Sequence, residues 1–134
     1  MAVYFADTWL FIAVLYRFDE HHAQAARLWR RLASERIVTH DGVLTEMLAF
    51  FSGGGVRARQ EAVDMTRRIL AQNEVVPVDR TLFHRGLDRY AARLDKEYSH
   101  IDCMSMIVME DRRIQHVFTN DHHFAQAGFT VVNQ

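Results

Sequence analysis

The chain has 134 residues, of which 49% are hydrophobic, and its formal net charge is −1. This size and apolar content suit one compact domain with its own core, so we expect a single domain spanning residues 1–134. The near-neutral charge excludes a polycationic nucleic-acid binder, and any contact with nucleic acid must use local clusters of charge.

Several features argue against secretion or a membrane location. The longest apolar run, residues 9–16, is well short of the roughly 20 residues that cross a bilayer. The N-terminus has no basic segment followed by a small-residue cleavage site, as a secretory signal would. The single cysteine, Cys103, cannot form an internal disulfide and fits a small buried hydrophobe. We therefore expect a cytoplasmic protein with no membrane contact.

The first elements place an acid at the end of a strand. Residues 3–6 form a short apolar strand, residues 9–16 a helix, and residues 20–34 a second helix with one apolar stripe. Asp7 follows the strand directly. In an open parallel sheet, the carboxyl ends of the strands are the usual ligand site.

The middle of the chain continues the alternation of strands and helices, which predicts an α/β fold. A strand over residues 36–39 precedes a helix that carries Glu46. The buried face of that helix is marked by Val43, Leu44, Met47, Leu48 and Phe51. Glycines 53–55 end it and serve either as a simple connector or as a hinge beside a substrate channel. A long helix over residues 56–72 and a strand over 75–78 follow.

The next predicted helix, residues 81–96, carries three arginines at four-residue intervals. These are Arg85, Arg89 and Arg93, which share one face of the helix. Asp88 and Asp95 neutralise much of this charge, which favours a solvated surface, and a phosphate-binding strip is the alternative.

The segment 99–112 predicts a central, buried helix because it is apolar nearly all round. Asp102 lies in its first turn. Ser99 and Asp102 have the spacing of a capping box, with Asp in place of the usual Glu. From this pattern alone, Asp102 is as well explained by helix capping as by a functional site.

Four acids lie at the edges of apolar segments: Asp7, Glu46, Asp102 and Asp121. Each has a local explanation, since Asp7 and Asp121 can cap the helices after them and Glu46 can lie on the rim of its helix. However, strands ending at Ala6 and Thr119 both deliver an acid to the same sheet edge. Two charges 4 Å apart repel by about 4 kcal/mol at an effective dielectric near 20. A shared pocket therefore favours a hard divalent cation.

The residues that carry these acids resemble the four motifs of the PIN-domain family, and most closely its VapC-type toxins. The matching stretches are Asp7-Thr8, Val43-Leu44-Thr45-Glu46, Ile101-Asp102, and Thr119-Asn120-Asp121-His122-His123-Phe124 with Gly128. Asp19, His22 and Ala25 also match a spacing seen in those toxins. The loop over residues 52–59 is richer in glycine than the family pattern.

This resemblance implies a three-layer α/β domain whose five parallel strands, in the order 3-2-1-4-5, have helices on both faces. It also implies a Mg²⁺- or Mn²⁺-dependent endoribonuclease, the toxin of a toxin–antitoxin pair. The catalytic, metal-binding residues carry over to Asp7, Glu46, Asp102 and Asp121, with Thr8 and Thr119 orienting them. The implied partners are an RNA substrate, a small VapB-like antitoxin that covers the pocket, and a second copy in a homodimer.

One other metal and two other functions compete with this interpretation. Zinc held by the pairs His21-His22 and His122-His123 is disfavoured, because neither pair has the spacing of a zinc site. An aspartyl phosphatase needs a second acid two positions after Asp7, where this chain has Trp9. A catalytically silent PIN-like module that binds RNA or protein stays open.

Overall fold

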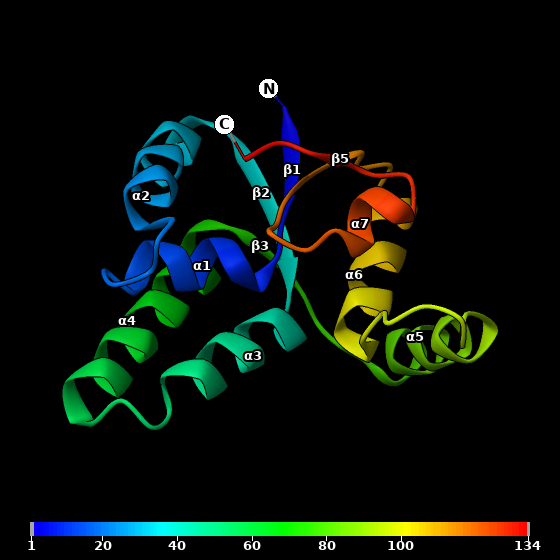
Figure 1. Cartoon of the computed structure of the whole chain (residues 1–134), viewed down its shortest axis with the longest axis horizontal. Coiled ribbons are helices and arrows are strands. Elements are labelled where there is room, and N and C mark those ends of the chain that lie inside the picture. Colours follow the sequence, from blue (N-terminus) through cyan, green and yellow to red (C-terminus); the bar gives the residue numbers. More distant parts are fainter. Residues whose placement is uncertain (1, 134) are drawn as a thin grey trace.

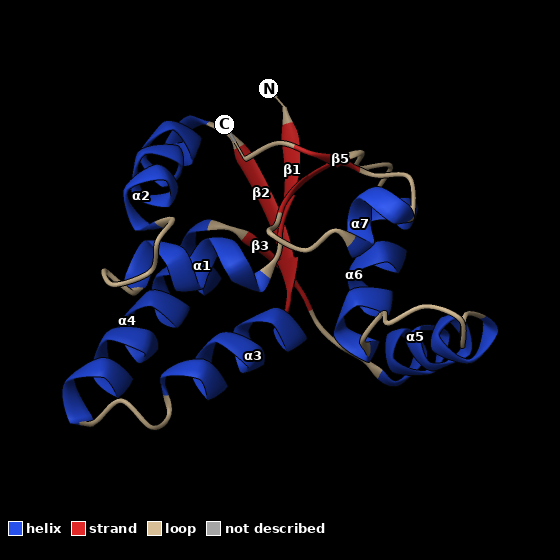
Figure 2. Ribbon diagram, viewed as in Figure 1, coloured by secondary structure: helices blue, strands red, loops and turns tan. Residues whose placement is uncertain are grey.

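The computed structural model describes residues 2–133 and contains one five-stranded parallel sheet between two groups of helices (Figures 1 and 2). The strands are β1 (Val3–Ala6), β2 (Arg36–His40), β3 (Glu74–Val76), β4 (His116–Phe118) and β5 (Thr130–Val131). Their order is β3-β2-β1-β4-β5, which confirms the order expected from the resemblance.

The first strand lies at the centre of the sheet and pairs on both sides. Phe5 is opposite Val38 of β2 and Val117 of β4, and all three side chains are fully buried. Strands covered on both faces are apolar without strict alternation, as β1 is. This arrangement brings the carboxyl ends of β1 and β4, with the acids that follow them, to one edge of the sheet.

Four helices and one 3-10 turn connect the first three strands. They are α1 (Thr8–Leu15), α2 (His22–Arg31), η1 (Leu32–Ser34), α3 (Asp41–Phe51) and α4 (Val56–Gln72). Figure 1 shows α1 to α4 together on one side of the sheet. The predicted helix over 20–34 is shorter than expected, because the Asp19 side chain accepts from the His21 backbone in a turn before it and the last turn tightens into η1.

The other side of the sheet is covered by α5 (Arg80–Ala92), α6 (His100–Asp111) and α7 (His123–Gln126) (Figure 1). Residues 102–109 of α6 are all buried, as the sequence predicted. α5 and α6 approach closely at Gly86, where a Cβ atom would lie 2.6 Å from Met104 Cγ. The helices thus cover both faces and form the expected three layers.

The arginine face of α5 does not present free positive charge. The two terminal guanidinium nitrogens of Arg85 donate to Asp111, and Arg89 donates to Glu110. Both acids lie at the end of α6. Arg93 pairs with Asp95. These pairs fit the solvated-surface interpretation and leave no basis for a phosphate-binding strip.

Two further predicted elements end earlier than expected, and one strand was not predicted. The predicted strand 75–78 ends at Val76, because Pro77 has no N–H for the ladder. The predicted helix 81–96 ends at Ala92 and continues as a turn. No residue pattern indicated β5, which has only two residues.

Across residues 2–133, every helix is too short or too polar to span a bilayer.

Candidate functional site

A cavity of about 740 Å³ opens at the sheet edge where β1 and β4 end. Three of the four predicted acids, Asp7, Glu46 and Asp121, line it. Thr8, Thr119 and Asn120 add polar groups, and Trp9, Ile12 and Phe50 form its apolar wall. The three acids thus lie together at one edge of the sheet, as the sequence predicted.

Asp7 is buried, with 7% of its surface exposed. Its backbone N–H donates to Phe118 O and thereby continues the pairing between β1 and β4. Its side chain accepts a 2.7 Å hydrogen bond from Thr119 Oγ1, the orienting contact expected for that threonine. Although Asp7 occupies the cap position of α1, its side chain makes no capping hydrogen bond further into the helix than Thr8, so helix capping does not explain this residue.

The environment of Asp7 disfavours its charge. Burial raises the pKa of this carboxyl from 3.8 to about 7, and the nearby charges of Asp102 and Glu46 also raise it. Hydrogen bonds from Thr119 and from the Thr8 backbone lower the pKa, but burial outweighs them. A cation beside Asp7 would relieve this conflict.

Asp102 has a structural role that the sequence predicted. Its Oδ2 accepts from the Ser99 backbone N–H at 3.0 Å, and its own N–H donates to Ser99 Oγ at 2.9 Å, which completes the capping box. The same Oδ2 lies 3.0 Å from His123 Nδ1. Capping engages one carboxylate oxygen, and Asp102 is also close enough to Asp7 to affect its pKa.

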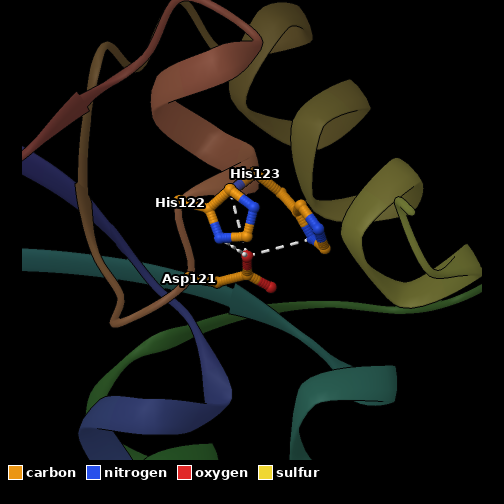
Figure 3. A group of neighbouring side chains, drawn as sticks. All are labelled: Asp121, His122 and His123. Atoms are coloured by element: carbon orange, nitrogen blue, oxygen red, sulfur yellow. Dashed lines mark hydrogen bonds and ion pairs between the residues drawn. The ribbon is translucent and has the colours of Figure 1, made fainter. Parts of the chain in front are cut away.

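His123 joins Asp102 to Asp121. Its Nδ1 lies 3.0 Å from an oxygen of each carboxylate, and its backbone N–H donates to Asp121 Oδ1 at 2.9 Å. Figure 3 shows the imidazole turned toward the Asp121 carboxylate. The His123 ring also packs against the rings of Tyr98 and His122, with centroid separations of 5.4 Å and 4.6 Å. No sequence spacing indicates this bridge, because Asp102 and His123 are 21 residues apart.

His122 is a weaker neighbour of the site. Its Nδ1 lies 3.9 Å from Asp121 Oδ1, and 72% of its side chain is exposed. The ligand atoms of Asp121, His122 and His123 all lie within 4.8 Å of one another (Figure 3). However, His123 Nδ1 already contacts two carboxylates, and the three residues are consecutive in one turn, so the spacing argument against zinc still applies.

The four predicted acids are spread more widely than this trio. Within residues 2–133, no three of their carboxylates come within 4.8 Å of one another. Asp7, Glu46 and Asp121 share the cavity, and Glu46 reaches it from the exposed face of α3. Asp102 is joined to Asp121 by His123. A cation here would be held by a few carboxylates and by water, which is the usual environment of Mg²⁺.

The donor atoms of the site fit a hard divalent cation. Protein donors hold Asp102 and Asp121 by one oxygen each, Oδ2 and Oδ1 respectively. Their second oxygens have no hydrogen-bond partner among the described residues and can serve as ligands. The Thr8 hydroxyl is buried and has no partner within residues 2–133, so its expected orienting bond to an acid is absent.

Comparison with known proteins gives a consistent result. The profile of the PIN domain matches residues 4–130. The 23S rRNA-specific endonuclease VapC20 of Mycobacterium tuberculosis is 29% identical over 129 residues, which are 96% of each chain. The same relative is found in two strains of that species.

Two solved structures share the fold along nearly the whole chain. One is the crystal structure of M. tuberculosis VapC20, described as a toxin that cleaves the sarcin–ricin loop. It has a TM-score of 0.83 and 26% identity and covers 95% of this chain and 96% of that chain. The other is VapBC2 from Rickettsia felis bound to promoter DNA, with a TM-score of 0.65, 15% identity and 97% coverage of both chains. The second similarity supports the fold alone.

Proposed function

Because the chain belongs to the PIN-domain family, we propose that it is a metal-dependent endoribonuclease and the toxin of a toxin–antitoxin pair. One observation carries the proposal. Asp7 is buried at the carboxyl edge of the sheet, in a cavity it shares with Glu46 and Asp121, and its pKa is raised to about 7. A carboxyl perturbed by burial and by neighbouring acids in a cleft is typical of a functional site.

Asp7, Glu46, Asp102 and Asp121 are the proposed ligands of Mg²⁺ or Mn²⁺. When bound, such a cation supplies a nucleophile at neutral pH and stabilises negative charge on a phosphate. The chain's own contribution is orientation. Thr119 fixes Asp7, and His123 fixes Asp102 and Asp121.

RNA is the proposed substrate, and ribosomal RNA is the first kind to test. The M. tuberculosis relative is named for cleavage of 23S rRNA, and the solved structure is of a toxin that cuts the sarcin–ricin loop. The apolar wall of the cavity includes the half-exposed Phe50 and the indole of Trp9. Aromatic surfaces next to a cleavage site suit unpaired bases, which stack on them.

The test uses purified protein with intact ribosomes and with a mixed RNA pool, in Mg²⁺, Mn²⁺ or chelator. Cutting is expected only with a divalent cation, and Asp102→Asn is expected to abolish it. Asp111→Asn is the matched control, because Asp111 ends the same helix, pairs with Arg85 on the surface and is remote from the cavity. RNA binding without cutting in any metal would instead favour the catalytically silent module.

We also propose two protein partners. A small antitoxin would cover the cavity and the exposed aromatic side chains beside it, Tyr16, Phe18 and Phe50, whose rings contact one another. A second copy of the chain would dock on the exposed apolar stripe of α5, formed by Phe83, Leu87 and Tyr90. Exposed apolar surfaces of this kind are typical of protein interfaces.

A further inference from the structure

The segment after β5 runs back to the candidate site, where the Asn133 side chain meets the Thr119 backbone. Asn133 Nδ2 donates to Thr119 O at 2.5 Å, and Thr119 N donates to Asn133 Oδ1 at 3.1 Å. A side-chain amide carries the same donor and acceptor as a peptide group. Asn133 therefore makes to Thr119 the two hydrogen bonds that a neighbouring strand would otherwise make.

This contact continues the sheet beyond its backbone pairing. β5 pairs with β4 at His116 and Val117, and Val132 N donates to Val117 O as the last backbone bond between the two segments. Thr119 lies beyond this bond and is only 1% exposed, so its backbone groups depend on protein partners. Buried backbone groups without partners are costly, and the Asn133 amide prevents that cost here.

Thr119 is the residue through which two of the acids are held. Its Oγ1 donates to Asp7 Oδ2 at 2.7 Å and accepts from the Asp121 backbone N–H at 3.0 Å. The position of this hydroxyl therefore affects the carboxylate of Asp7 and the start of the turn that carries Asp121. Any shift of the Thr119 backbone moves both acids.

The tail, residues 132 and 133 after β5, is also held by α2. Gln24 Nε2 of α2 donates to the Asn133 backbone O at 2.6 Å. In Figure 1 the red segment after β5 runs back across the sheet toward α2, away from α5 and α6. A continuous chain of hydrogen bonds thus connects α2, the tail, Thr119 and the acids at the sheet edge.

We propose that Asn133 is a positioning residue for the metal site, acting through Thr119 on Asp7 and Asp121. This inference rests on the proposed function and deepens it. Asn133 lies outside residues 4–130, the part that the PIN domain profile matches. Groups that orient metal ligands typically contribute about 10- to 100-fold in metal affinity or activity. Asn133 does not touch an acid itself and acts through Thr119, so we expect its replacement to have an effect at the lower end of this range.

The experiment compares Asn133→Leu with Gln115→Met in the full chain. Leucine keeps the branched shape of asparagine with methyl groups in place of the amide oxygen and nitrogen, and methionine is an unbranched side chain of about the length of glutamine without its amide. Gln115, the residue before β4, is the matched control because its Nε2 also bonds to the segment around β5, donating to Gly128 O at 2.8 Å and Thr130 Oγ1 at 3.2 Å. Its side chain makes no hydrogen bond to Thr119. The readouts are Mn²⁺ affinity by calorimetry, kcat and KM for RNA, and the melting temperature.

Asn133→Leu is expected to weaken Mn²⁺ binding about tenfold and to lower kcat by a similar factor, with little change in KM for RNA. Gln115→Met is expected to leave all three within twofold. Gln24→Met, which frees the tail but keeps the Asn133 amide, should give a smaller loss of Mn²⁺ affinity and serves if Asn133→Leu does not fold.

Wild-type Mn²⁺ affinity in Asn133→Leu, or in Gln24→Met if the first variant is unfolded, would overturn the proposal. An equal loss in Gln115→Met would also overturn it, since a general loosening of the sheet would then explain both. Failure of the proposed function looks different, because the wild-type protein itself would then neither bind Mn²⁺ nor cut RNA.

Discussion

At the scale of single residues, Asp7 links stability to function. Its folded pKa of about 7 lies above the ordinary value of 3.8, so the folded state holds the proton more tightly than the unfolded state does. The stabilising effect is therefore complete below about pH 4 and is lost as pH rises through 7. The ionised Asp7 carboxylate therefore destabilises the folded, metal-free protein at neutral and higher pH.

Asp7→Asn is expected to abolish RNA cleavage and to stabilise the metal-free protein. The gain should be small at pH 4 and grow to the order of 4 kcal/mol above pH 7, because a rise of about three pKa units corresponds to that energy. Urea unfolding in EDTA across pH 4–8.5 measures it. Excess MgCl₂ should stabilise wild type and not the variant, and equal curves for the two proteins at every pH would contradict a buried, repelled carboxylate.

His123 offers a second test at this scale. His123→Phe keeps the ring against Tyr98 but removes the donor between Asp102 and Asp121. We expect a loss of about 1–3 kcal/mol in EDTA, the usual cost of leaving buried polar groups unpaired. In saturating MgCl₂ the loss of stability should be much smaller, because the bound cation then offsets the repulsion between the Asp102 and Asp121 carboxylates.

His122→Phe is the control for this experiment. His122 is largely exposed and only 3.9 Å from Asp121, so its replacement should change stability little in either condition. A loss in His123→Phe that is the same with and without Mg²⁺ would show that the imidazole has only a packing role.

At the scale of elements, the contact between α5 and α6 depends on Gly86. A Cβ atom there would lie 2.6 Å from Met104 Cγ and 2.9 Å from His100 Nε2. Gly86→Ala should therefore destabilise by about 1–3 kcal/mol through overpacking, although alanine favours a helix interior. Thermal unfolding measures the change. Gly53→Ala, with open space around its Cβ position, should be near neutral, and a stabilised Gly86→Ala would mean that the two helices are less tightly packed.

The sequence predicted most elements because their signals are local. The helix over 56–72 was predicted with its observed bounds, because the glycines before it do not favour a helix. In the structure Gly55 has a φ of 92°, a conformation that few other residues adopt. The Ser99 capping box was predicted for the same reason. β5 gave no signal, because two exposed residues have no periodicity and are ordered by pairing with β4.

The difference between local signals and long-range contacts also explains which residues of the site could be predicted. Asp7 was placed from the sequence because it follows a strand directly, and its edge is fixed by the parallel fold. His123 and Asn133 were missed because their partners lie 21 and 14 residues away, and no spacing rule reaches across such a distance. Sequence patterns also cannot give burial, and it is burial that shifts the pKa of Asp7.

At the scale of the whole molecule, the proposed homodimer can be tested through α5. Leu87 is 47% exposed at the centre of the apolar stripe, and Leu70 of α4 is 53% exposed outside it. Leu87→Glu should convert the dimer to a monomer, because a buried unpaired charge is costly, whereas Leu70→Glu should leave it intact. Sedimentation equilibrium measures the mass. A monomeric wild-type protein, or a dimer that survives Leu87→Glu, would contradict this interface.

The candidate site draws on both halves of the chain, and this has a consequence for how such a protein is made. Asp7 emerges from the ribosome early, but its neighbours at the sheet edge arrive only when Asp121 and then Asn133 have been synthesised. Domains fold as their segments become available during translation. A nascent chain that has not yet reached Asp121 therefore lacks one of the four acids, and the proposed site forms only after Asp121 and Asn133 have been synthesised.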